Sequence, residues 1–318
     1  MTIDIHGHVT SPELFERFPM PPSLADIDGM IGRKAALGIG ITIVGSPVGA
    51  GTMVSLPGLD NYAQAADQLD AFHEWVAQTV QAHQDHLRAY VYVNPFAEDD
   101  SLSRAAKWLS QEEFVGLIVN TSVRGEYLGS PKADPFFALA AETSSPVLLH
   151  PPAQPVGAEA LHGHLGLIEH LARPCDVTCE VAAILFADWL DKYPELKVIA
   201  PNAGAALPLL REKLDLAQQR GPGGPPGGAV EVPGIPASER LREIYVDTAT
   251  PSDLSLAAAL EVFGPGHMLF GTDSPPLISP LVTALEMVGR LDLTTGQRER
   301  ILGGNARGLF GLPAGGTP

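Results

Sequence analysis

Eight short apolar segments recur along the chain and set its overall pattern. They begin at Thr2, Ile41, Leu87, Phe114, Pro146, Leu196, Glu243 and His267. Each segment is rich in leucine or β-branched residues and lacks the polar alternation of a half-exposed strand. Each is therefore predicted to be a strand that is buried on both faces.

Helical patterns lie between most of these segments. In residues 64–83 the apolar side chains recur at helical spacing on one face, namely Leu69, Phe72, Trp75, Val76 and Val80. Residues 180–197 and 207–220 show similar patterns. Buried strands that alternate with helices predict an α/β fold, a single closed (β/α)8 TIM barrel. An open doubly wound sheet is the alternative, but no glycine-rich dinucleotide turn follows the first segment.

We expect one domain that spans residues 1–318. Residues 221–236 are dense in glycine and proline, which excludes regular structure and predicts a loop between the sixth and seventh strands. A solvent-exposed loop is the simpler interpretation, and a lid or subunit contact is the alternative. Residues 313–318 are predicted to be a frayed tail.

Composition narrows the class of protein. Apolar residues make up 45% of the chain, enough for a large core, and 37 acidic against 20 basic residues give a net charge of −17. This charge argues against nucleic acid or a membrane surface as a partner. The sequence shows no signal peptide or membrane-spanning run, and Cys175 and Cys179 are interpreted as reduced thiols, so we expect a cytoplasmic protein.

Candidate chemistry is expected where the strands end, because barrel enzymes place catalytic groups at the carboxyl ends of their strands. His6 and His8 lie two residues apart on an extended segment, so both imidazoles point to the same side. His150 and Asp273 end two other strands. Three histidines and one carboxylate are suitable ligands for one divalent ion. We expect Gly7 to let the backbone approach that ion.

A second His-Gly-His unit, His162 to His164, lies in a proline-rich loop with no strand to align its rings. We interpret it as a packed or solvated loop, with His164 a candidate substrate contact. The other histidines are interpreted as structural or surface residues: His73, His83, His86, His170 and His267.

Further polar residues follow other strands. They are Ser46, Asn120 to Arg124, Asn202, Asp247 and Thr248. Arg124 is a candidate clamp for a substrate carboxylate, because a guanidinium binds carboxylates through two parallel hydrogen bonds. An exposed loop arginine is the alternative. Arg33 and Lys34 are expected to lie in solvent.

Six motifs in order resemble the metal-dependent amidohydrolase superfamily, and within it the aminocarboxymuconate-semialdehyde decarboxylase-like (amidohydrolase-related) branch. They are "IDIHGH", "PVLLHPP", "YPELKVIAPNAGAALPLL", "EIYVDTAT", "MLFGTDSPP" and "ILGGNARGLFGL". The resemblance runs nearly end to end. It implies that His6, His8, His150 and Asp273 are metal ligands, usually for Zn²⁺ and sometimes for Mn²⁺.

Two features of the chain refine what this resemblance implies. Relatives with two metals carry a lysine at the end of the fourth strand, and "IVNTSVRGE" has none, so one metal ion is expected. The family usually has a histidine after the sixth strand, where this chain has Asn202. An amide cannot take a proton near neutral pH, which weakens any mechanism that needs a base there.

The resemblance favours a metal-dependent, non-oxidative decarboxylase, a lyase acting on a small aromatic or unsaturated carboxylic acid. Asp273 would deliver the proton, and a homodimer is expected from the relatives. A hydrolase or hydratase with one metal, acting on a lactone, amide, C–C or C=C substrate, is the first alternative. A non-catalytic ligand-binding barrel, with Asn202 as the sign of lost catalysis, is the second.

Overall fold

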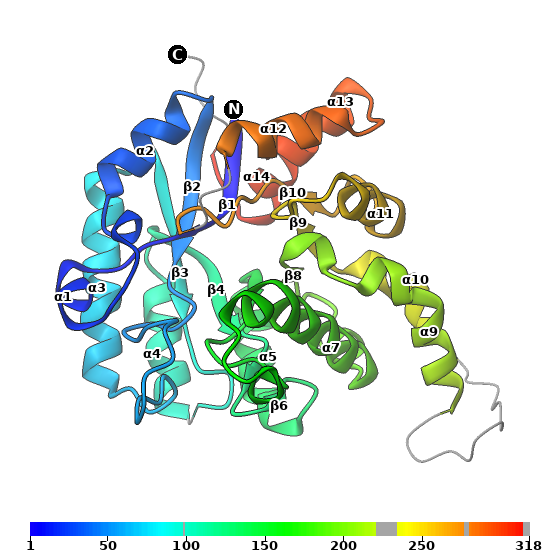
Figure 1. Ribbon diagram of the computed structural model, residues 1–318, viewed down its shortest axis with the longest axis horizontal. Helices are drawn as coiled ribbons and strands as arrows, with labels where there is room; N and C mark the ends of the chain where they lie inside the picture. Colours follow the sequence, from blue (N-terminus) through cyan, green and yellow to red (C-terminus); the bar gives the residue numbers. More distant parts are fainter. Residues whose placement is uncertain (98, 221–233, 277–279, 314–318) are drawn as a thin grey trace.

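The computed structural model describes residues 1–97, 99–220, 234–276 and 280–313. Its main sheet contains eight parallel strands in the order β1-β2-β3-β4-β7-β8-β9-β10, surrounded by helices (Figure 1). The strands are β1 (Thr2–His8), β2 (Ile39–Gly45), β3 (Leu87–Tyr92), β4 (Phe114–Asn120), β7 (Val147–His150), β8 (Val198–Ala200), β9 (Tyr245–Asp247) and β10 (Met268–Leu269). These are the eight predicted segments, so the TIM-barrel prediction is confirmed.

The barrel closes between its first and last strands. The Ile5 N–H donates a hydrogen bond of 2.9 Å to the carbonyl oxygen of Phe270, one residue beyond β10. Two further short strands, β5 (Ser122–Val123) and β6 (Glu126–Tyr127), form an antiparallel pair outside the barrel.

Helices cover the outside of the barrel (Figure 1). The α-helices are α1 (Pro12–Arg17), α2 (Ile27–Ala35), α3 (Ala66–Ala82), α4 (Asp99–Leu109), α5 (Asp134–Glu142), α6 (Leu165–Leu167), α7 (Arg173–Phe186), α8 (Trp189–Lys192), α9 (Leu207–Arg220), α10 (Ala237–Arg240), α11 (Asp253–Phe263), α12 (Leu281–Arg290), α13 (Thr295–Glu299) and α14 (Asn305–Leu309). Within the described ranges, no helix is both long and apolar enough to cross a bilayer.

The strand segments are continuous hydrophobic runs because each strand packs against two apolar layers, one on each face. One cluster fills the barrel interior and includes Ile5, Ile43 and Leu148, each no more than 1% exposed. The other lies between the strands and the helices and includes Phe72 and Val76 of α3. A strand with apolar side chains on both faces shows little alternation.

Some expectations fall outside the described residues, and one about solvent exposure is wrong. Residues 221–233 of the predicted loop and residues 314–318 of the predicted tail are not described. Cys175 and Cys179 of α7 are free, as expected. Lys34, however, is not in solvent: it is 2% exposed. It shares a helix face with the core residue Met30, four positions earlier, and its charge is met by a buried carboxylate described below.

Candidate metal centre

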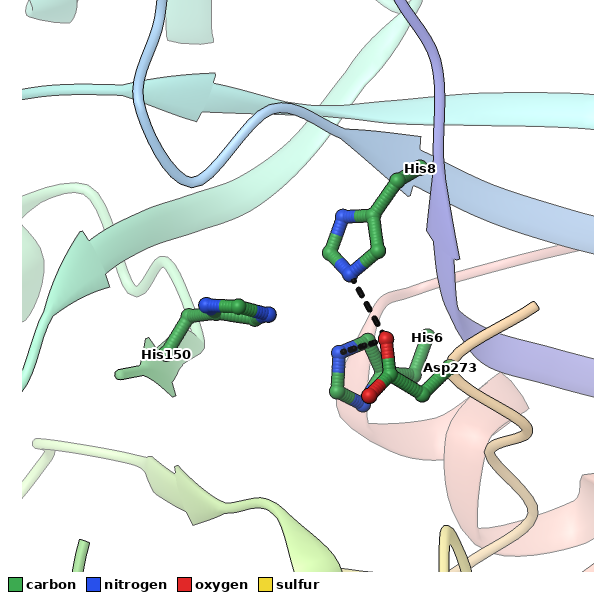
Figure 2. Close-up of side chains that lie close together, drawn as sticks. All are labelled: His6, His8, His150 and Asp273. Atoms are coloured by element: carbon green, nitrogen blue, oxygen red, sulfur yellow. Dashed lines mark hydrogen bonds and ion pairs between the residues drawn. The ribbon is translucent and has the colours of Figure 1, made fainter. Parts of the chain in front are cut away.

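Four side chains from three parts of the chain meet at the carboxyl ends of the strands (Figure 2). His6 and His8 come from β1, His150 ends β7, and Asp273 follows β10. One ligand atom from each lies within 4.8 Å of those of the others. The structure thus brings together all four residues that were predicted to hold a metal ion.

An irregularity in β1 turns both histidines into the barrel. Ile3 and Ile5 point into the apolar interior, and the register with β2 shifts between Asp4 and Gly7. A bulge of this kind changes which residues face inward, so His6 and His8 face the interior after it.

Gly7 is required for a different reason than the one expected. A Cβ there would lie 2.7 Å from the Thr42 Cγ2 atom of β2, on the side that faces Lys34. The glycine therefore allows close packing of β1 against β2, rather than approach of the backbone to an ion.

Each histidine uses Nδ1 to bond the protein, which leaves Nε2 for a ligand. His6 Nδ1 lies 2.6 Å from the Asp247 Oδ2 atom. His8 Nδ1 donates to the Gly45 carbonyl at 3.2 Å, and His150 Nδ1 donates to the Pro151 carbonyl at 2.8 Å. A carbonyl oxygen only accepts, so Nδ1 of His8 and of His150 carries a proton. In the neutral rings Nε2 then has a lone pair for a ligand, although His8 Nε2 also lies within hydrogen-bond distance of the Asp273 Oδ1 atom.

The three rings are nearly perpendicular to one another. Their centroids lie 4.8 to 5.5 Å apart, and the angles between ring planes are 84° to 88°. Asp273 completes the set: its Oδ1 lies 3.0 Å from His8 Nε2 and 3.6 Å from His6 Nε2. Asp273 has a φ of 53°, in the left-handed region. That conformation must be held by its surroundings.

A buried network supports β1 and the segment that carries Asp273. Asp4 is fully buried, and its carboxylate accepts hydrogen bonds from the His6 N–H at 3.0 Å and the Lys34 ammonium at 2.7 Å. It also accepts from the Thr272 N–H at 3.1 Å and the Thr272 hydroxyl at 2.6 Å. One carboxylate therefore fixes His6 and the residue before Asp273 together.

Asp247 orients the first histidine. This residue ends β9, is fully buried, and accepts on Oδ1 from the Ala249 N–H at 3.0 Å. Its Oδ2 faces His6 Nδ1. A carboxylate behind a ligand histidine fixes its ring and strengthens it as a donor.

The carboxylates and the imidazoles of the site shift one another's pKa values in different directions. Burial lowers the pKa of His6, but the carboxylates of Asp273, Asp247 and Asp4 raise it to about 9. Burial and the neighbouring histidines lower the pKa of His150. Although burial opposes it, the charge of His6 and the hydrogen bond from His8 lower the pKa of the Asp273 carboxyl.

The donor atoms of the site are suited to a divalent ion. His6 Nε2 is buried and has no hydrogen-bond partner among the described residues. A buried polar atom without a partner costs free energy unless something binds it. Three imidazole nitrogens and one carboxylate oxygen are a donor set that suits Zn²⁺ or Mn²⁺.

The remaining predicted site residues make their hydrogen bonds to groups other than the four ligands. The Asn202 amide donates to the Ala249 carbonyl at 3.0 Å, and the residue is half-buried. His164 is exposed, and its Nδ1 accepts from the Leu167 N–H at 3.3 Å. Arg124 is exposed and its guanidinium bonds the Asp60 carboxylate at 2.7 and 3.1 Å. The structure brings neither His164 nor Arg124 to the four ligands.

Sequence reasoning missed the supporting residues. Asp247 was identified only as a strand-end residue, although its position at a carboxyl end was a usable signal. Asp4 and Lys34 carried no such signal, because neither follows a strand and their pairing joins residues 30 positions apart.

Comparisons with known proteins agree with this geometry. The profile of the amidohydrolase family matches residues 3–312. The chain is 22% identical over 256 residues to a 2-amino-3-carboxymuconate-6-semialdehyde decarboxylase of Dictyostelium discoideum, covering 79% of this chain and 69% of that protein.

Solved structures share the fold. A 5-carboxyvanillate decarboxylase of Sphingomonas paucimobilis matches with a TM-score of 0.82 at 18% identity, covering 98% of this chain and 99% of the other. A dihydroxybenzoic acid decarboxylase of Polaromonas sp., with bound manganese and the inhibitor 2-nitroresorcinol, matches with a TM-score of 0.79 at 20% identity, covering 98% and 97%. With a family match over nearly its whole length and the ligand set of His6, His8, His150 and Asp273, the chain belongs to the amidohydrolase family.

Proposed function

We propose that this protein is a metal-dependent, non-oxidative decarboxylase of an aromatic carboxylic acid. The observation that carries the proposal is the three-histidine, one-aspartate cluster, in which a carboxylate faces the shared ligand position. The activities of the similar proteins support the same reaction class. We propose one divalent ion, Zn²⁺ or Mn²⁺. When bound, it would supply the positive charge that holds and orients the substrate carboxylate.

Asp273 is the proposed proton donor. The charge of His6 and the hydrogen bond from His8 lower the pKa of its carboxyl, so it takes up the proton from solvent in each turnover and passes it directly to the substrate. Its contacts with His6 and His8 involve Oδ1, so Oδ2 is available to a substrate. A proton from Oδ2 adds to the ring carbon that bears the carboxylate. The carbon–carbon bond then breaks, its electron pair restores the aromatic ring, and CO₂ leaves. Solvent returns a proton to Asp273, so each turnover consumes one proton.

Asn202 is proposed to orient the substrate. Its amide nitrogen is used by the Ala249 carbonyl, so its Oδ1 can accept a hydrogen bond from a ring hydroxyl. Decarboxylation does not require a base at this position, because no water molecule must be activated. Contacts of substrate with His164 and Arg124 stay predictions.

The test measures both products of the reaction. Purified protein is first analysed for metal by elemental mass spectrometry, with about one ion per chain expected. Carboxyl-labelled hydroxybenzoic acids are then supplied in D₂O. Labelled CO₂ together with one deuterium on the vacated ring carbon supports the proposal. Addition of water without CO₂ from lactone, amide or alkene substrates would instead establish a hydrolase or hydratase.

An Asp273→Asn variant separates proton transfer from binding. The amide keeps an oxygen but cannot deliver a proton, so kcat should fall by about 10²- to 10⁴-fold. An unchanged kcat in variant protein that still holds its metal would exclude Asp273 as the donor.

A further inference from the structure

A cavity of about 280 Å³ lies between helices α3 and α4, at the carboxyl end of β3. Figure 1 shows the two helices on the same side of the barrel. None of the described residues that line the cavity is a ligand of the metal centre. A cavity of about 150 Å³ is enough to hold benzene, so this one has room for a substituted aromatic ring.

Two buried polar groups in the wall of this cavity have no hydrogen-bond partner among the described residues. They are the hydroxyl of Tyr92, the last residue of β3, and Nδ1 of His73 in α3. Both residues are only 3% exposed. A buried polar group without a partner costs free energy, so both groups indicate a ligand that forms hydrogen bonds.

The tautomer of His73 defines what this ligand must offer. Its Nε2 accepts the Tyr92 N–H at 3.0 Å, and burial lowers its pKa to about 4, so the ring is neutral at pH 7. The single proton of the ring is therefore on Nδ1, which requires an acceptor. Burial raises the pKa of the Tyr92 hydroxyl, which keeps its proton and can both donate and accept.

Two other polar side chains of the wall already have partners. The Tyr62 hydroxyl donates to the Ser122 carbonyl at 2.8 Å, and the Trp108 Nε1–H donates to the Asp70 carboxylate at 3.0 Å. Their rings are left to contact a ligand through apolar atoms. Specific hydrogen bonds to a ligand thus fall to His73 and Tyr92.

The charges of the wall disfavour an anionic ligand. Arg104 is the only arginine or lysine among the described residues that line the cavity. Its guanidinium bonds the Asp70 carboxylate and, at 3.1 Å, the Asp100 carboxylate. An anion that entered here would lose its hydration without gaining an unpaired cation, so the wall favours a neutral ligand.

Apolar and aromatic side chains form much of the remaining wall. They are Tyr62, Leu69, Phe96 and Trp108. Aromatic side chains pack favourably against the face or edge of another ring. A flat ring with one polar substituent matches a wall that combines several aromatic side chains with two unpaired hydrogen-bonding groups.

We propose that this cavity is a second binding site, which takes a small neutral aromatic molecule that carries a hydroxyl group. The oxygen of such a hydroxyl accepts from the His73 N–H, the Tyr92 hydroxyl offers it a second partner, and the ring packs against the aromatic wall. The site lies outside the metal centre, and its occupation does not depend on the reaction proposed there.

The test compares three probes that differ in one group. Protein loaded with Zn²⁺ is titrated with 4-fluorophenol, 4-fluorotoluene and 4-fluorobenzoate, and binding is followed by fluorine NMR. The phenol should bind about 10-fold more tightly than either of the others. The methyl group forms no hydrogen bond, and the carboxylate meets no unpaired cation.

Substitutions then place the phenol in the cavity. Tyr92→Phe should lower its affinity about 3- to 10-fold, the range expected for one neutral hydrogen bond. The melting temperature and the affinity for 4-fluorotoluene should not change, because this hydroxyl has no partner in the described protein. Tyr62→Phe is the matched control: it lines the same cavity, but its hydroxyl is already bonded, so phenol affinity should match wild type.

His6→Ala separates this cavity from the metal centre. The variant lacks a metal ligand and should still bind 4-fluorophenol with wild-type affinity. Four outcomes would overturn the proposal. They are no saturable phenol binding in wild type, which would leave water as the occupant, equal affinity for the three probes, equal effects of Tyr92→Phe and Tyr62→Phe, and loss of binding in His6→Ala.

Discussion

At the scale of single residues, the two His-Gly-His units show that environment decides what a tripeptide does. His6 and His8 are buried on a strand whose irregularity turns both rings inward. In the second unit, His162 has a φ of 49° and His164 caps the three-residue helix α6. An extended strand aligns side chains two residues apart, and a turn does not.

Removal of a ligand histidine should empty the metal site. His6→Ala or His8→Ala each deletes one of four donors, so purified variants should contain almost no metal by elemental analysis. Variants His162→Ala and His164→Ala should retain about one ion per chain, because neither ring reaches the cluster. Retention of metal by His6→Ala would refute the ligand assignment.

Asp247→Asn should weaken metal binding without abolishing it. The two oxygens of Asp247 face two donors, His6 Nδ1 and the Ala249 N–H. An amide has one oxygen for one of these donors, and its NH₂ group faces the other donor without an acceptor. Loss of such a supporting carboxylate typically reduces metal affinity about 10- to 100-fold, which competition with a chelator would measure. Asp253→Asn, at an exposed pair with Arg290, serves as control and should leave the affinity unchanged.

The four ligands could be predicted from sequence because parallel strands bring their carboxyl ends together. The position of helix α7 could not. It depends on the hydrogen bonds that Asp176 makes to loops after two other strands. Contacts of this kind join residues 54 and 20 positions apart and leave no local pattern.

At the scale of elements, α2 is joined to the barrel by charge as well as by apolar packing. The Lys34 ammonium and the Asp4 carboxylate form a buried pair at 2.7 Å, with side chains 3% and 0% exposed. Removal of one partner from such a pair leaves an uncompensated buried charge. The pair links α2, β1 and, through Thr272, the segment after β10.

Lys34→Met should reduce the free energy of unfolding by about 3–5 kcal/mol in urea titrations. Arg33→Met is the matched control: this neighbour pairs with Asp26 at the surface, so its loss should cost less than about 1 kcal/mol. The double variant Asp4→Asn with Lys34→Met should be more stable than Lys34→Met alone. Equal costs for the Lys34 and Arg33 variants would contradict this account.

His73 of helix α3 makes the free energy of unfolding depend on pH. The ring is buried, its Nε2 accepts the Tyr92 N–H at 3.0 Å, and burial lowers its pKa to about 4 although Asp70 opposes the shift. The unfolded chain binds a proton on His73 at a higher pH than the folded chain does. The contribution of His73 to the free energy of unfolding is therefore fully present above about pH 6.5. It should fall as the pH drops to about 4.

The drop is measurable against a variant that does not titrate. Because the pKa of His73 is about 6.5 in the unfolded chain and about 4 in the folded one, the free energy of unfolding should decrease by roughly 3 kcal/mol as the pH falls through this range. His73→Gln keeps an acceptor for Tyr92, so its unfolding free energy should vary less over this range than that of wild type. His170→Gln, at an exposed position, should retain the wild-type profile. Identical profiles for the wild type and His73→Gln would contradict the assignment.

Predictions of elements succeeded where burial on both faces left a clear signal, as in β4 and β7. They did not identify the hairpin of β5 and β6, since two-residue strands are too short to show periodicity. The π-helical turn Ile168–Ala172 before α7 was also not foreseen. Its backbone differs from an α-helix in hydrogen bonding rather than in residue pattern.

At the scale of the whole molecule, the metal centre lies where the two ends of the barrel meet. His6 and His8 belong to the first strand, and Asp273 follows the last. Bonds from Thr272 to Asp4 and from Ile5 to Phe270 close the same junction. Helix α14 packs beside β1 and reinforces it (Figure 1).

Metal removal should therefore lower the stability of the entire barrel. Binding to the folded state alone adds about 4 kcal/mol when free metal is about a thousandfold above Kd. Chelated protein should show a lower melting temperature, restored by Zn²⁺ or Mn²⁺, while chelated His6→Ala should show no response to added metal. A melting temperature that is unaffected by chelation would contradict a bound ion at this junction.

The closing bonds also determine the order in which the barrel can assemble. The His8–Asp273 and Asp4–Thr272 contacts join residues 265 and 268 positions apart, whereas adjacent strands elsewhere are near neighbours along the chain. Contacts between distant residues carry the largest loop-closure entropy, which the intervening strands must first reduce. The ion is thus expected to bind a barrel that is already built, and refolding without metal should reach the same fold before the ion enters.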